Sequence, residues 1–149
     1  MEKAFERVLD LLGKPNNDGL FAQFIEYLGE KPEILLQTDR VTEYDFGRSG
    51  LHLSYQSNSL RDSSLEGSVF AFAIFSLRPD SKVLTSRRSY VGNLPYGIKR
   101  GDSRDEVAIK LGIPADLTGD DILYEFSDYK FSFSFFGDPL NLASLFVSH

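Results

Sequence analysis

The side chains best suited to chemistry in this sequence are two histidines and several carboxylates. His52 lies in a stretch of alternating apolar and polar residues, and His149 is the last residue. A Ser-His-Asp triad would have to use His52, but no nucleophile-elbow motif lies near it. The sequence contains no cysteine and no His-x-x-x-His pair, so it offers neither thiolate nor paired-histidine metal ligands. We therefore expect no catalytic residue, no metal and no cofactor.

The carboxylates are densest in one short run of the C-terminal half, namely Asp120, Asp121, Glu125 and Asp128. Calcium loops place oxygen ligands at fixed positions within about twelve residues, and this run lacks that spacing. Two interpretations stay open: a solvated acidic rim, or a patch on which a partner docks. The loop from Gly97 to Asp102 precedes a predicted helix, but its carboxylate would repel an anion. The sequence contains no P-loop and no Gly-x-Gly-x-x-Gly motif.

The net charge of −6 is unevenly spread along the chain. Residues 1–75 carry −5, residues 76–100 carry +5 and residues 101–149 carry −6. An acidic protein is a poor match for nucleic acid, whose backbone is itself negative. The basic segment, which includes Arg87 and Arg88, could contact nucleic acid or neutralise its two acidic flanks. We favour neutralisation and expect no nucleic-acid partner.

The candidate residues lie in or beside segments in which apolar and polar residues alternate. This alternation is typical of half-buried strands. The predicted strands are residues 42–46, 51–55, 69–77, 122–126, 129–136 and 140–147. Their predicted inward side is large and mostly aromatic: Tyr44, Phe46, Leu51, Leu53, Tyr55, Tyr124, Phe126, Phe131, Phe133 and Phe135. Their predicted outward side is small, polar and net acidic: Glu43, Asp45, His52, Ser54, Glu125, Lys130, Ser132 and Ser134. Segment 69–77 is apolar on both sides, which predicts a central or doubly covered strand.

Three helices are predicted to cover the inward side: residues 2–12, residues 19–28, and the residues after Ser103 up to Leu111. Ser103 and Glu106 form a capping box, and Gly112 with the following proline ends that helix. Val107, Ile109 and Leu111 are its predicted apolar packing groups. Residues 116–121 are predicted to form a turn.

The length and composition predict a single domain over residues 1–149. Its predicted parts are a first repeat at 1–77, a basic connector at 78–93 and a second repeat at 94–149. The N-terminus reads as an amphipathic helix and not as a signal peptide, and no apolar run approaches the ~20 residues of a membrane span. We therefore expect a cytoplasmic protein that does not cross a membrane.

The two halves read as copies of one unit. Three pairs of segments correspond: LGEKP (28–32) with LGIP (111–114), YDF (44–46) with YEF (124–126), and LHLSY (51–55) with FSFSF (131–135). The strand pairs share one offset of 80 residues, and the helix ends differ from it by three. This predicts an α+β fold built from two repeats, each a helix plus a three-stranded meander, in an antiparallel sheet with helices on one face. The alternative is that any α+β domain shows such alternation.

The segments FERVLDLLGKP (5–15), YLGEKP (27–32), YDFGRSGLHLSY (44–55), LPYGIKRGDSRDEVAIKLGIP (94–114) and YEFSDYKFSFSF (124–135) cover most of the chain. In these segments the sequence resembles small bacterial immunity proteins, the inhibitors encoded beside polymorphic or contact-delivered toxins. Segment 101–114, with its GDSRDEV (101–107) and LGIP (111–114) motifs, is also similar to the repeat unit of BamE/SmpA-like and β-lactamase-inhibitor-like proteins. The resemblance implies a sheet with helices on one side and a docking face on the other. The chain lacks a lipobox, which argues against an envelope lipoprotein.

We therefore expect a non-catalytic immunity protein that occludes a cognate toxin, with a cytoplasm-acting nuclease as one candidate. The predicted partner-binding residues are Glu43, Asp45, His52, Asp120, Asp121, Glu125, Asp128 and Lys130. The predicted aromatic anchors are Tyr90, Tyr96 and Phe136. The alternative is an adaptor or assembly module of the same fold, and a small enzyme that uses the acidic cluster is a third option. We expect a monomer or a weak dimer.

Overall fold

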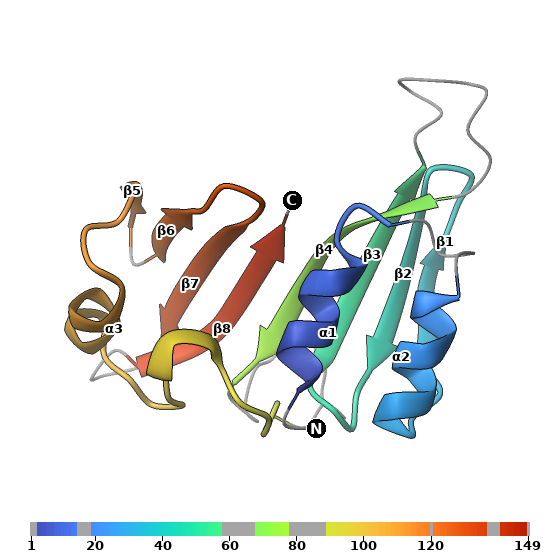
Figure 1. The fold of residues 1–149 in the computed structure, drawn as a ribbon, viewed down its shortest axis with the longest axis horizontal. Coiled ribbons are helices and arrows are strands. Elements are labelled where there is room, and N and C mark those ends of the chain that lie inside the picture. The colour runs from blue at the N-terminus through green and yellow to red at the C-terminus, as the bar shows by residue number, and fades with distance from the viewer. Residues whose placement is uncertain are drawn as a thin grey trace.

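The computed structural model describes residues 3–14, 19–57, 68–77, 89–119, 121–136 and 141–148. These residues form a mixed α+β fold in which three helices accompany one antiparallel sheet of eight strands (Figure 1). The predicted α+β class and antiparallel sheet are confirmed. Asp120, His149 and most of the Ser-rich loop and of the basic connector lie outside the described residues.

The helices follow the predicted positions closely. They are α1 (Ala4–Leu11), α2 (Leu20–Leu28) and α3 (Arg104–Leu111), with a short 3-10 turn η2 (Pro95–Gly97) ahead of α3. Helix α2 ends at Gly29, which adopts the left-handed conformation at φ 64° that a side chain would strain. Helix α3 begins at Ser103, whose hydroxyl accepts a hydrogen bond from the Glu106 amide at 3.2 Å, as its capping sequence predicts.

Eight strands form the sheet. They are β1 (Glu33–Gln37), β2 (Val41–Phe46), β3 (Leu51–Ser57), β4 (Ser68–Ser76), β5 (Asp116–Thr118), β6 (Asp121–Glu125), β7 (Lys130–Phe136) and β8 (Asn141–Ser148). Their order across the sheet is β1-β2-β3-β4-β8-β7-β6-β5. Each half of the chain is therefore a meander, and the last strands of the two meanders pair antiparallel at the middle of the sheet (Figure 1). The prediction that segment 69–77 is central is confirmed.

Each meander has four strands, so the prediction of three was wrong. The additional strands are the two edges, β1 and β5. The sequence of β1 does not alternate, and β5 has only three residues, which is why periodicity did not identify them. Residues 116–121 are therefore not a simple turn, because Asp116, Leu117 and Thr118 pair with β6.

One face of the sheet is covered by the helices (Figure 1). Phe5 of α1 contacts Phe75 and Phe131 at ring-centroid distances of 5.2 and 5.5 Å, so it joins the two halves of the sheet. Phe24 of α2 packs edge-on against Phe46 at 5.8 Å. Eight of the ten predicted inward residues are buried, and the other two, Tyr44 and Phe126, are partly buried against the same core. Burial of these rings is the main favourable term in folding.

The packing of helix α3 differs from the prediction. Val107 is fully buried, but Ile109 is 83% exposed, so the expected packing of Ile109 was wrong. Asp102, in the loop before α3, is 5% exposed and accepts hydrogen bonds from the Lys99 amide at 2.9 Å and from Lys110 Nζ at 2.6 Å. Its backbone oxygen accepts a hydrogen bond from the amide of Leu142. Asp102 therefore ties the loop, α3 and β8 together.

A candidate docking face

The second face of the sheet carries the candidate site. Directly paired residues of neighbouring strands share a face, and two rows cross this face from β2 to β6. The first row is Asp45, His52, Ile74, Phe146, Ser132 and Leu123. The second row is Glu43, Ser54, Phe72, Ser148, Lys130 and Glu125. We call these twelve residues the open face, because the described helices lie on the opposite side of the sheet (Figure 1).

The centre of the open face is apolar. Phe72 and Ile74 of β4 and Phe146 of β8 are half-buried and adjacent. The rings of Phe72 and Phe146 lie 4.9 Å apart with an interplanar angle of 30°. The prediction of a uniformly small and polar outward surface was therefore wrong at the centre. Partly exposed apolar groups with a polar surround are typical of a protein-binding surface.

Carboxylates begin both rows and end the second. They are Asp45 and Glu43 at the beginning and Glu125 at the end. The first row continues to the sheet edges, where Glu33 of β1 pairs with Asp45 and Asp116 of β5 pairs with Leu123. The apolar centre is thus flanked by negative charge on both sides.

The predicted residues of the first half lie together. His52 Nε2 is 3.6 Å from Glu43 Oε2, within ion-pair range, and the His52 ring stacks on Phe72 at 6.4 Å. Asp45 lies directly opposite His52. Both are more buried than expected for an outward surface, at 7% and 9% exposure, so they offer little contact area to a partner.

Ser54 is fully buried although it lies on this face. In its row it lies between the larger residues Glu43 and Phe72. Its Oγ has no hydrogen-bond partner among the described residues. A buried hydroxyl without a hydrogen-bond partner costs free energy, so the Ser54 hydroxyl is expected not to stabilise the fold.

The predicted residues of the second half form a separate group. Lys130 lies opposite Glu125, which reduces the negative charge there. Asp121 belongs to β6, whereas the exposed Asp128 lies in the turn before β7. Asp120 lies outside the described residues, and the structure does not bring the other seven predicted residues into one cluster. It places them in two groups separated by the apolar centre.

The three predicted aromatic anchors differ in exposure. Tyr90 is fully buried against Phe75 at 4.9 Å and donates a hydrogen bond to the Asn93 carbonyl, so its prediction as an exposed anchor was wrong. Burial raises the pKa of Tyr90. Tyr96 and Phe136 are 51% and 63% exposed, as an anchor requires.

Tyr96 has an unusual backbone. Its φ of 56° is the only positive value among the non-glycine residues in the described ranges, and such a conformation costs about 1 kcal/mol or more. The ring of Tyr96 stacks on Phe126 at 5.6 Å and 9°, and its hydroxyl lies 3.4 Å from that of Tyr129. The hydroxyl pair, together with burial, raises the pKa of Tyr129 to about 12. These contacts fasten η2 to the turn between β6 and β7.

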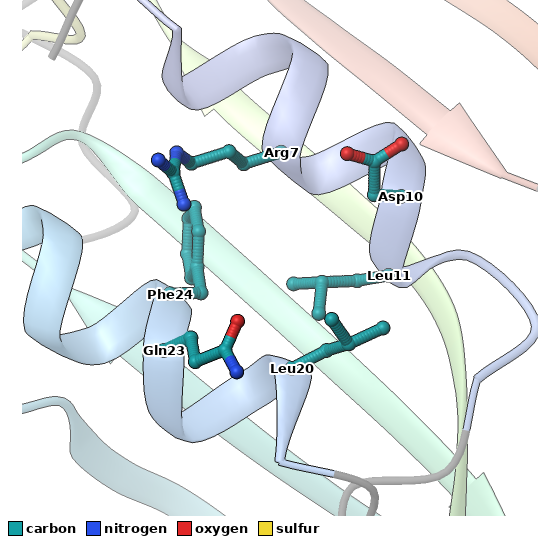
Figure 2. A pocket seen from close by; sticks show the side chains of 6 residues that line it. All are labelled: Arg7, Asp10, Leu11, Leu20, Gln23 and Phe24. Carbon is teal, nitrogen blue, oxygen red and sulfur yellow. The ribbon is translucent and has the colours of Figure 1, made fainter.

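A shallow pocket lies between α1 and α2, away from the open face (Figure 2). Its lining residues are Arg7, Asp10, Leu11, Leu20, Gln23 and Phe24. A volume of about 40 Å³ is far below the ~300 Å³ or more of small-molecule sites. Within the described ranges there is also no group of three or more His, Asp or Glu side chains able to hold a metal ion. None of the helices there is long and apolar enough to cross a membrane.

Sequence reasoning missed Phe72, Ile74 and Phe146 as site residues. The signal was present, because strand 69–77 is apolar on both sides. An apolar strand at the centre of a sheet with helices on one side must turn half of its apolar side chains toward the other side. No family model, curated protein or solved structure matches this chain.

Proposed function

We propose that this protein is a non-catalytic immunity protein that binds a cognate toxin through the open face and neutralises it by occlusion. The observation that carries the proposal is the anatomy of that face: Phe72, Ile74 and Phe146 at the centre, and carboxylates at the beginning of both rows and at the end of the second. An apolar centre supplies binding free energy by desolvation, and the charged surround supplies specificity. The resemblance to immunity proteins selects a toxin as the partner.

The charge of the open face favours a basic partner. Glu43, Asp45 and Glu125 attract a positive surface and accelerate its association, whereas an acidic surface is repelled. A nuclease needs a basic cleft to hold its substrate, so a nuclease toxin acting in the cytoplasm fits this charge. The protein would then cover the cleft without cleaving or modifying the toxin.

We also propose that the two halves derive from duplication of one unit, with α2 and β1–β4 corresponding to α3 and β5–β8. A twofold axis perpendicular to a sheet makes equivalent neighbouring strands antiparallel, and β4 and β8 pair in this way. The helices support the same correspondence. Phe24 and Val107 are both buried, and Gly29 and Gly112 both end a helix, at one offset of 83 residues.

The hairpins support the duplication further. Ser54 pairs with Phe72 and Ser134 with Ser144, and in both hairpins the register shifts directly after the serine. An irregularity repeated at an offset of 80 residues is difficult to explain by general strand propensity.

The pairing of β2 and β6 corrects the sequence alignment of the repeats. Phe46 pairs with Leu51, and Tyr124 pairs with Phe131. Phe46 therefore corresponds to Tyr124, and the match of Tyr44 with Tyr124 is shifted by two residues. The second hairpin absorbs the difference in its turn.

The test is binding to the product of the neighbouring upstream gene, co-expressed and co-purified with this protein. We expect a complex that weakens as salt increases, because the open face is acidic. Ile74→Glu at the centre of the face should lower the affinity at least tenfold. Ile113→Glu is the matched control, since Ile113 is 95% exposed and lies at the end of α3.

Three outcomes would refute the proposal. They are the absence of a complex, a neighbouring gene that does not encode a toxin, and equal loss of affinity in the two variants. A hydrolytic activity of the isolated protein that is lost on changing Asp121 and Glu125 to amides would instead support the enzyme alternative.

An adaptor or assembly module is the second candidate function. The observation that favours it is the exposed apolar edge of β1, where Ile34, Leu35 and Leu36 are 51%, 40% and 44% exposed. Such an edge is a template for pairing with another chain.

A further inference from the structure

Four of the exposed aliphatic side chains among the described residues lie at the two edges of the sheet, whereas Val91, Ile109 and Ile113 lie outside it. Ile34, Leu35 and Leu36 belong to β1, and Leu117 belongs to β5. Strand β1 is the longer edge, at five residues against three, and all five of its residues are exposed. No Lys or Pro lies within it, although these are the residues that commonly protect an edge. The protective features that β1 does have are the charge of Glu33 and a register shift between Ile34 and Leu36.

The charges around β1 are balanced, in contrast to the rest of the chain. Residues 31–40 contain two bases, Lys31 and Arg40, and two acids, Glu33 and Asp39, while the whole chain has a net charge of −6. The side chains of Lys31, Glu33 and Asp39 take part in the strand pairing described below, and that of Arg40 does not. A second copy of the chain is therefore not repelled at this edge, although it would be repelled at the acidic open face.

An antiparallel pair of β1 strands centred on Leu35 is self-complementary. In this register Leu35 meets its own copy, Ile34 meets Leu36 and Glu33 meets Gln37, so no like charges face each other. Lys31 meets Asp39, and the twofold axis repeats this pair of opposite charges on the other side. Both are exposed in the isolated chain.

We propose that two copies of this chain associate through their β1 edges, antiparallel and centred on Leu35, into one continuous sheet. The interface is small, because five residues per chain pair, so the dimer is weak and depends on concentration. The twofold axis is perpendicular to the sheet. Both helix layers therefore lie on one side, and both open faces lie on the other.

This arrangement has a consequence for docking that rests on the proposed function. Two open faces on one side can engage two copies of a toxin, or two basic patches of one assembly. Binding of the second face would then be intramolecular, which raises the apparent affinity without any new contact.

The experiment is sedimentation velocity of the purified full chain from about 1 µM to about 1 mM, the range in which small interfaces associate. We expect the mass to rise from 16.8 kDa toward twice that value. Leu35→Lys should lower the association constant at least tenfold. Leu117→Lys, at the opposite edge and with 55% exposure in the native chain, should leave association unchanged. Circular dichroism checks that both variants are folded.

Charge reversal tests the register. Lys31→Glu and Asp39→Lys should each lower the association constant by roughly two- to fivefold for every Lys31–Asp39 pair that is lost, and the dimer contains two such pairs. The double variant should restore it, which a merely structural defect would not allow. A mass that stays at 16.8 kDa at every concentration would overturn the proposal. So would association that survives Leu35→Lys, that is lost in Leu117→Lys, or that the double variant fails to restore. No toxin is present, so failure here leaves the docking experiment unaffected, and the reverse also holds.

Discussion

Asp102 holds the beginning of the second half of the chain, and replacing it should destabilise the fold. Its side chain is 6% exposed and accepts a hydrogen bond from Lys110 Nζ at 2.6 Å. It also accepts one from the Lys99 amide at 2.9 Å. Asp102→Asn keeps the shape of the side chain but removes its charge. The ammonium of Lys110 and the amide of Lys99 then lose a charged acceptor.

The structure limits the size of this effect. Breaking a fully buried ion pair costs about 3–5 kcal/mol, and a hydrogen bond to a charged group contributes about 1.5–3 kcal/mol. The side chain of Lys110 is 28% exposed, so its ammonium can turn to water in the variant. We therefore expect the free energy of unfolding to fall by about 1.5–3 kcal/mol at pH 7, measured by urea denaturation with circular dichroism.

The same substitution predicts a pH dependence. Burial alone would raise the pKa of Asp102, but the hydrogen bonds from Lys110 and from the Lys99 amide outweigh it and hold the pKa below the ordinary value of 3.8. A carboxyl with a lowered pKa in the folded state contributes stability above its unfolded pKa and loses it as the pH falls through the folded value. The stability difference between the native chain and Asp102→Asn should be constant from about pH 6 to 8 and shrink below about pH 4.

Asp105→Asn is the matched control. Asp105 is exposed in the first turn of α3, where its charge only meets the helix dipole, and its loss should cost about 0.3–1 kcal/mol. Equal stability losses for the two variants at pH 7 would refute the reasoning. A difference that grows below pH 4 would refute it as well, because it would require a raised pKa.

Two further substitutions test the core and the open face. Phe133 is fully buried and packs edge-on against Tyr124 at 5.9 Å, so Phe133→Ala should cost about 3–5 kcal/mol in urea denaturation. Phe133→Leu should cost less, and similar losses for both would contradict the packing described. Ser54→Ala removes a buried hydroxyl without a partner among the described residues, so it should be neutral or stabilise by up to about 1 kcal/mol. A loss of more than about 1 kcal/mol would mean that the hydroxyl is satisfied after all.

Local signals predicted the elements well. In β7 every second residue is phenylalanine, and Phe131, Phe133 and Phe135 are buried as that alternation requires. The helix that begins at Ser103 has its cap, because a hydroxyl at that position satisfies a free backbone amide. These outcomes depend only on residues within one element or one turn.

Features that depend on distant residues were not predictable from these signals. Ile109 has the same apolar character as Val107, but only Val107 faces the sheet, and the direction of α3 decides this. Tyr90 was expected at the surface because its neighbours are polar. The composition of its own segment does not reveal that its ring packs against Phe75 of β4. The pairing of β4 with β8, which creates the apolar centre of the open face, likewise joins distant residues, such as Ile74 and Phe146, which are 72 positions apart.

The edges of the sheet connect the proposals to one another. A single four-stranded unit would have two uncovered edges, and pairing of β4 with β8 covers one edge of each half. The edges that remain are β1 and β5, and only β1 is long enough and sufficiently balanced in charge to pair with its own copy. The dimer proposed through β1 would therefore repeat, between two chains, the antiparallel strand pairing of β4 with β8 that joins the two halves within one chain. In the proposed dimer the axis is perpendicular to the sheet, so the second chain extends the same face toward a partner.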